Sequence, residues 1–180
     1  MTARARLVEE VQEAGTQDAT AEVVGRWLRD SRLTEALGDA DAGELLYRSD
    51  DLTIVKVVVL PRYSFYPHDH RMWAVVATVR GREENVFFER ADAGLERVGG
   101  RVFGEGDIGL LADDVIHTVT NPLPAFTVGL HVYGGDLLAA GASEWDPRTH
   151  DERPYDFEAE AARKAAWAAE LESVRSSGTQ

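Results

Sequence analysis

The chain has 180 residues, the length of one domain with a substantial core, and carries a formal net charge of −13 and no cysteine. This acidity argues against nucleic acid or an anionic membrane surface as a partner, and the missing cysteine excludes disulfides, cysteine-ligated zinc and a thiol nucleophile. Because no apolar run approaches membrane-spanning length and the charged N-terminus lacks a signal core, we expect a cytoplasmic protein.

The first 43 residues are predicted to be helical. Residues 3–14 place apolar side chains at helical spacing, and Asp18 is expected to cap a second helix. The apolar side of that helix is formed by Val23, Val24, Trp27 and Leu28. A short helical turn over residues 33–37 is expected to end at Gly38. We expect these helices to pack on the outside of the domain.

From Glu44 the apolar pattern changes to that of β-strands, punctuated by glycine and proline. The expected strands cover residues 44–48, 52–60, 72–80, 83–90, 95–98, 101–103, 107–112, 115–120 and 125–135. So many short strands at close spacing predict a sandwich or barrel over residues 44–135.

The sheet signal ends at Gly135. Residues 136–155 are predicted to form an irregular, acidic strap, and residues 156–174 an alanine-rich helix. Trp167, Leu171 and Val174 would share one helix face, docking on the barrel or on a second subunit. The predicted single domain thus has helices at 1–43, a barrel at 44–135, and the strap and helix at 136–180; monomer and homodimer remain open.

Two histidines, His68 and His70, stand two residues apart at the start of an apolar run. In a β-strand, residues i and i+2 point to the same face, so these imidazoles form a ready pair of metal ligands. His117 lies mid-strand between Val115 and Val119, where a charged imidazole is costly and a neutral, metal-bound one is not. A solvated histidine or a hydrogen-bonded core histidine is the alternative.

A second polar pair lies on the last expected strand. His131 and Tyr133 are two residues apart and should share a face. An ordinary barrel tyrosine is the alternative for Tyr133. His150 lies in the polar strap and is expected to be solvated.

Several stretches resemble the cupins. GEGDIGLLADDVIHTVTN is similar to the second cupin motif, and PHDH followed by Gly81 is similar to the first. The glutamate usual four residues after the second histidine is replaced by Ala74, as in the three-histidine cupins. HDHRMWAVVATVRGRE, LHVYGGDL and EWDPRTHDERPY resemble the thiol dioxygenases, meaning cysteine dioxygenase and especially the bacterial 3-mercaptopropionate dioxygenase type. The resemblance covers roughly residues 50–155.

The resemblance implies a mainly β fold, the cupin double-stranded β-helix or jelly-roll barrel, flanked by the N-terminal helices and the C-terminal helix. It places Fe(II) on His68, His70 and His117, and makes Tyr133 and His131 the catalytic pair. The implied reaction adds both atoms of O₂ to the sulfur of a small organic thiol, giving a sulfinic acid. The serine of the family's Ser-x-His-x-Tyr sequence is Gly129 here, which removes one outer hydrogen bond.

The substrate-binding arginine of the mercaptopropionate group has no counterpart, because residues 137–142 hold no basic residue. A substrate carboxylate then needs another partner. The candidates for substrate binding are Arg62 and Tyr66, which share an expected inward-facing parity, and Arg71, directly after His70, with a solvated arginine as the alternative for each arginine. A bulkier, aromatic or less acidic thiol is the other solution.

Two further functions stay open. One is a three-histidine cupin oxygenase or isomerase that acts on a non-thiol substrate. The other is a non-catalytic cupin that binds a metal or a small molecule. For the favoured function the partners are a small-molecule thiol and O₂, without nucleic acid or membrane.

Overall fold

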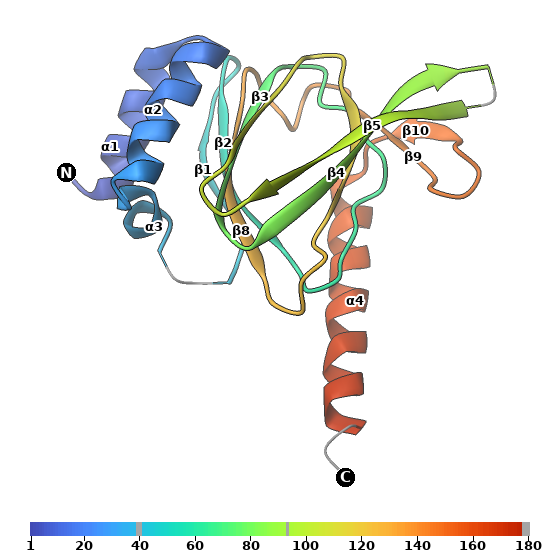
Figure 1. Ribbon diagram of the computed structural model, residues 1–180. Coiled ribbons are helices and arrows are strands. Elements are labelled where there is room, and N and C mark those ends of the chain that lie inside the picture. The colour runs from blue at the N-terminus through green and yellow to red at the C-terminus, as the bar shows by residue number, and fades with distance from the viewer. Residues whose placement is uncertain (39–40, 93, 178–180) are drawn as a thin grey trace.

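The computed structural model describes residues 1–38, 41–92 and 94–177 (Figure 1). Three helices lie along one side of a β-barrel, and the C-terminal helix extends away from the barrel on the other side (Figure 1). The mainly β fold with helices at both ends is therefore confirmed, and the two antiparallel sheets of its barrel are those of the predicted double-stranded β-helix.

The N-terminal helices are α1 (Ala3–Ala14), α2 (Gln17–Arg29) and α3 (Arg32–Leu37), and α3 ends at Gly38 as expected. The prediction that Asp18 caps α2 is wrong: the Thr16 hydroxyl accepts the hydrogen bond from the Ala19 N–H, and Asp18 lies in the first turn. Apolar side chains of these helices form one core with the outer face of the barrel's larger sheet.

The larger sheet has the order β1-β2-β8-β3-β6, and the smaller one β5-β4-β7. Their strands are β1 (Glu44–Arg48), β2 (Thr53–Val59), β3 (Ala74–Arg80), β4 (Arg82–Ala91), β5 (Gly94–Gly104), β6 (Ile108–Leu111), β7 (Ile116–Thr120) and β8 (Thr127–Tyr133). Gly81, at φ 86°, makes the tight turn from β3 in one sheet to β4 in the other. Alternation decides the faces: Ile54 and Val132 pack outward on the helices, while Val55 and His131 face inward.

Two sequence-based expectations about strands need correction. The expected strands at 95–98 and 101–103 are one strand, β5, because Gly99 and Gly100 stay paired with β4 and a register shift at Phe87/Phe88 absorbs the irregularity. The strap is not wholly irregular: β9 (Ser143–Trp145) and β10 (Glu152–Pro154) form a small antiparallel hairpin.

The strap is fastened to the segment that carries two of the histidines. The Trp145 N–H donates to the Pro67 carbonyl at 2.8 Å, and the Asp69 N–H donates to the Ser143 carbonyl at 3.1 Å. Between them, the fully buried Glu144 carboxylate accepts from Arg153 at 2.8 Å and from Arg163 at 2.7 Å. These contacts hold the strap against the barrel interior.

The last helix, α4 (Phe157–Ser177), begins after Asp156, whose carboxylate accepts from the Glu158 and Ala159 N–H groups. The predicted docking face is only partly correct. Trp167 is half-buried and its indole N–H donates to the Pro61 carbonyl at 2.8 Å, whereas Val174 is 65% exposed. Only the first part of α4 rests on the barrel. None of the helices in the described residues is long and apolar enough to cross a membrane.

Candidate metal centre

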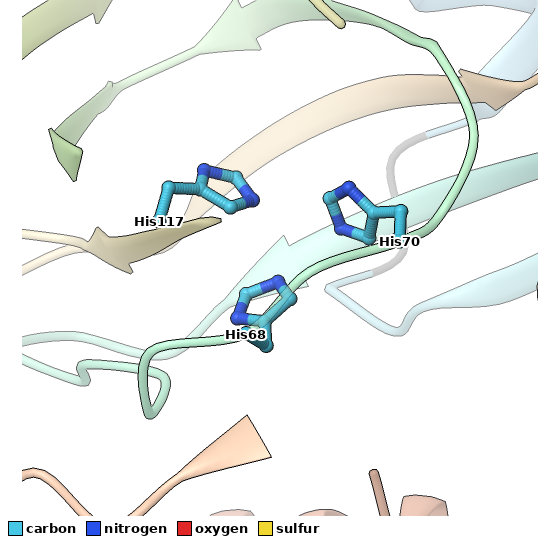
Figure 2. A group of neighbouring side chains, drawn as sticks. All are labelled: His68, His70 and His117. Atoms are coloured by element: carbon cyan, nitrogen blue, oxygen red, sulfur yellow. The ribbon is translucent and has the colours of Figure 1, made fainter. Parts of the chain in front are cut away.

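Three histidine side chains meet inside the barrel (Figure 2). His68 and His70 come from the segment before β3, and His117 from β7. Figure 2 shows the three rings turned toward one another; their centroids are 4.7 to 5.1 Å apart, and the available ring nitrogens lie within 4.8 Å of each other. Single ligand–metal bonds of about 2 Å therefore allow one ion to touch all three.

The expectation that His68 and His70 lie in a strand is wrong, but its consequence holds. They lie in an extended segment outside β3, where His68 makes isolated bridges to His117 and to Glu144. The His68 N–H donates to the His117 carbonyl and the His117 N–H donates to the His68 carbonyl, both at 2.9 Å. Because the backbone is extended, the two alternate side chains still share a face.

Hydrogen bonds fix which nitrogen of two ligands is free. His68 Nδ1 lies 2.8 Å from the Tyr66 carbonyl, and His117 Nδ1 lies 2.7 Å from Asn85 Oδ1. Both oxygens accept only, so each Nδ1 carries the proton and each Nε2 keeps its lone pair. His117 Nε2 is buried with no hydrogen-bond partner among the described residues. A metal ion would satisfy this orphaned atom.

The environment keeps these imidazoles neutral. Burial lowers the pKa of His68, and it lowers the pKa of His70 and of His117 well below the usual value, with the neighbouring imidazoles adding to the effect. A neutral imidazole is the form that binds a metal. The donor set therefore fits a divalent cation without first releasing protons near neutral pH.

No carboxylate or cysteine joins the three histidines within the part of the chain that the structure describes. Ala74, at the position of the missing glutamate, is fully buried at the start of β3. Asp69, between two of the ligands, is committed elsewhere: one oxygen accepts from the Ser143 N–H at 2.7 Å and the other from Arg90 at 3.3 Å. The candidate ligands are thus all nitrogen.

The predicted pair on β8 lies in the same interior. His131 Nδ1 is 3.2 Å from the Tyr133 hydroxyl, and the Tyr133 ring centroid is 4.9 Å from that of His70. Burial, with the Glu83 carboxylate as a second cause, raises the pKa of Tyr133. The phenol is therefore protonated at neutral pH, and its hydroxyl lies beside the ligand group.

Sequence reasoning missed Glu83. It lies on β4, is 1% exposed, and places Oε1 3.4 Å from His131 Nε2. A Cβ built on Gly129 would lie 3.4 Å from the same nitrogen and 2.9 Å from the Ala77 carbonyl oxygen, so a side chain at this position would require the backbone to shift. The available signal was strand alternation, because Glu83 shares the inward face of its strand with Asn85.

None of the three predicted substrate-binding residues lines the site. Arg62 is exposed and its guanidinium donates to the Pro122 carbonyl; Arg71 donates to Ser143 Oγ at 3.0 Å. The Tyr66 ring lies beneath the Arg163 guanidinium at 4.3 Å. The expected inward orientation of Arg62 is wrong because its φ is 60°, so strand alternation does not apply there. Arg71 also has a positive φ, of 55°, so strand alternation does not apply at that position either.

A cavity of about 250 Å³ opens beside the three histidines. Its apolar wall comes mainly from the barrel, and its far side comes from the strap and α4, which sequence reasoning did not assign to the site. Those added residues are Ala142, Tyr155, Phe157, Glu160, Ala161 and Lys164. The volume suits a small organic molecule.

Comparison with known proteins finds similarity in structure only. An RmlC-like cupin family protein with a double-stranded β-helix fold from Methanocaldococcus jannaschii is 17% identical; the match covers 56% of this chain and 86% of that chain, with a TM-score of 0.45. A Cupin 2 conserved barrel domain protein from Salinispora arenicola is 23% identical, covering 51% and 72%, with a TM-score of 0.40. No protein-family model matches the sequence, and no curated protein matches it.

An oxalate oxidase in complex with the substrate analogue glycolate is 16% identical, with a TM-score of 0.42 over 61% of this chain. The match covers 47% of that chain, so this chain spans about half the length of the oxalate oxidase. Strand order and sheet pairing carry the fold assignment: the molecule is a double-stranded β-helix whose interior holds a buried three-histidine group suited to a metal ion.

Proposed function

We propose that this protein is an iron(II)-dependent thiol dioxygenase that converts a small organic thiol to its sulfinic acid. The observation that carries the proposal is the all-imidazole ligand group with the Tyr133 hydroxyl beside it in one small, mostly apolar cavity. The resemblance of the motifs around His70 and His131 to those of the thiol dioxygenases supports the same reaction.

The donor set suits this chemistry. Three neutral imidazoles leave the full 2+ charge of the ion uncompensated, which favours an anionic thiolate as the next ligand. Held by His68, His70 and His117, iron(II) would supply the redox chemistry that activates O₂ toward the thiol sulfur. The balance is R–SH + O₂ → R–SO₂H: the O–O bond breaks, two S–O bonds form, sulfur is oxidised by four electrons and O₂ is reduced by four.

The chain's own residues position and enclose the reactants. Asn85 and the Tyr66 carbonyl orient the His117 and His68 rings. Tyr133 presents its hydroxyl to the space beside His70, and His131 holds that hydroxyl in place. Val55, Val57, Val119 and Leu137 make part of the wall around the sulfur apolar.

The test is anaerobic loading with Fe(II), metal analysis, and O₂ uptake with a panel of thiols whose products are read for a mass gain of two oxygens. We expect O₂ uptake that depends on the thiol, and a sulfinic acid product. O₂ uptake with non-thiol compounds added to the panel, and with none of the thiols, would assign another reaction class. Stoichiometric metal without O₂ uptake on any compound would make the protein a binding cupin.

A further inference from the structure

A cation from α4 lies in the wall of the cavity. Lys164 lines the cavity and its Nζ is 4.3 Å from the centroid of the Phe65 ring. It is half-buried, and within the residues that the structure describes it makes no hydrogen bond or ion pair. No arginine and no second lysine belongs to the cavity wall as far as the structure describes it. Lys164 thus lies in the cavity wall without a direct ion pair among the described residues.

The carboxylates in the same wall already have partners. Asp69 accepts from the Ser143 N–H and from Arg90, as described above. Glu160 accepts from the Tyr63 hydroxyl at 3.0 Å and from Arg163 at 2.8 Å. Both carboxylates are therefore already engaged by other donors. Burial lowers the pKa of Lys164, while the Glu160 charge opposes that shift.

The position of Lys164 relative to the ligand group limits the molecule that could join them. The Phe65 ring lies next to both groups: its centroid is 6.1 Å from the His68 ring centroid and 4.3 Å from Lys164 Nζ. These two distances together set the upper limit on the separation between Lys164 Nζ and the His68 ring. Other residues of the same cavity wall are apolar, including Val57 and Val119. A short molecule with a sulfur at one end, an apolar body and an anion at the other end matches this layout.

We propose that Lys164 is an anion subsite of this cavity, which binds the carboxylate of a short, apolar-bodied thiol whose sulfur lies at the three histidines. The proposal rests on the proposed function and deepens it. It gives the role left open by the missing arginine to α4 instead of to the strap, where Ala142 lines the cavity. A lysine ammonium is a point charge that pairs with a carboxylate, and the apolar surroundings strengthen that attraction.

The test compares acid and amide. Fe(II)-loaded protein is titrated calorimetrically, without O₂, with 4-mercaptobutyrate and with its neutral primary amide. Lys164→Met should weaken binding of the acid by about tenfold or more and leave the amide unchanged, as expected for loss of one charged hydrogen bond. Lys164→Arg should restore acid binding. Arg148→Met, which removes an exposed cation of the strap, is the matched control and should change neither affinity.

A second measurement reports on the amine itself. The sequence has two lysines, Lys56 and Lys164, and Lys56 is buried and donates to the carbonyls of Leu37 and Gly38. After reductive ¹³C-methylation, the Lys164 signal, assigned by its loss in Lys164→Met, should shift with the acid and not with the amide.

Equal affinity of wild type and Lys164→Met for the acid would overturn the proposal, as would a Lys164 signal that responds equally to acid and amide. These binding results do not depend on turnover. Acid-selective binding that is lost in Lys164→Met, in a protein with no O₂ uptake on any thiol, would uphold the subsite and reject the dioxygenase.

Discussion

Glu83 Oε1 lies 3.4 Å from His131 Nε2, and neither Glu83 oxygen nor this nitrogen has a hydrogen-bond partner among the described residues. A carboxylate can only accept, so a proton on His131 Nε2 satisfies both groups. Nδ1 of the same ring then carries a lone pair and accepts from the Tyr133 hydroxyl 3.2 Å away. Glu83 thus sets the direction of the hydrogen bond made by Tyr133.

Glu83→Gln is the variant that tests this arrangement. We expect it to keep its iron and to lower kcat by about tenfold, with KM little changed, because Glu83 acts through His131 and touches neither ligand nor substrate. Steady-state O₂ uptake and metal analysis measure the two effects. Glu89→Gln, an exposed change on the same strand, is the control. Full kcat in Glu83→Gln would show that Glu83 has no positioning role.

The metal assignment predicts loss of iron when any ligand is removed. Alanine at position 68, 70 or 117 should cost most of the iron bound by the reconstituted protein, because two imidazoles alone hold the ion weakly. Metal analysis after anaerobic loading gives the occupancy. His150→Ala, in the strap and outside the ligand group, should bind iron as wild type does. Stoichiometric iron in His117→Ala would refute the ligand set.

Tyr133→Phe separates chemistry from metal binding. The ring still fills its place beside His70, while the hydroxyl and its bond to His131 are lost. We expect normal iron content and a loss of turnover of about tenfold or more, typical of one positioned hydrogen-bonding group. An unchanged kcat would remove Tyr133 from the mechanism.

The two arginines that sequence reasoning put forward should not affect substrate affinity. Arg62 is exposed and donates to the Pro122 carbonyl. Arg71 donates to Ser143 Oγ and pairs with Asp69, and neither arginine belongs to the cavity wall. Arg62→Ala and Arg71→Ala should therefore keep the wild-type KM for an acidic thiol, in contrast to Lys164→Met. A clear rise of KM in Arg62→Ala would return that residue to the substrate site.

The metal-free protein should lose stability as the pH falls below neutral. Burial lowers the pKa values of the three ligand histidines in the folded protein. In the unfolded chain the same histidines titrate at about 6.5. Below that pH the unfolded state binds more protons than the native state, so its population grows. Thermal unfolding between about pH 8 and pH 5 should show Tm falling toward the acid side.

The pH range of this decline distinguishes the histidines from the carboxylates, because carboxylates in an unfolded chain titrate at a lower pH, about 4. His70→Asn removes one of the buried imidazoles and should make the decline of Tm shallower. A wild-type Tm that is flat across this range would contradict the buried, neutral state of the histidines.

Local sequence was enough to predict the barrel and the ligand group. Alternating apolar residues and glycine turns specify strands, and the i, i+2 spacing of His68 and His70 survives even though their segment is an extended loop. The pairing of His131 with Tyr133 follows from the same spacing. These features depend on neighbours in the chain, which is why pattern reasoning reached them.

Only the tertiary structure decided which residues from distant segments contact the site. Glu83 faces His131, and Lys164 reaches the cavity, because β4 and α4 pack there from distant parts of the sequence. Alternation failed at Arg62, where a positive φ turns the side chain out. Contacts between remote segments depend on how the whole chain folds back on itself, and no local periodicity encodes them. The sequence by itself therefore determined the fold and the three histidines; packing decided which carboxylate and which cation face them.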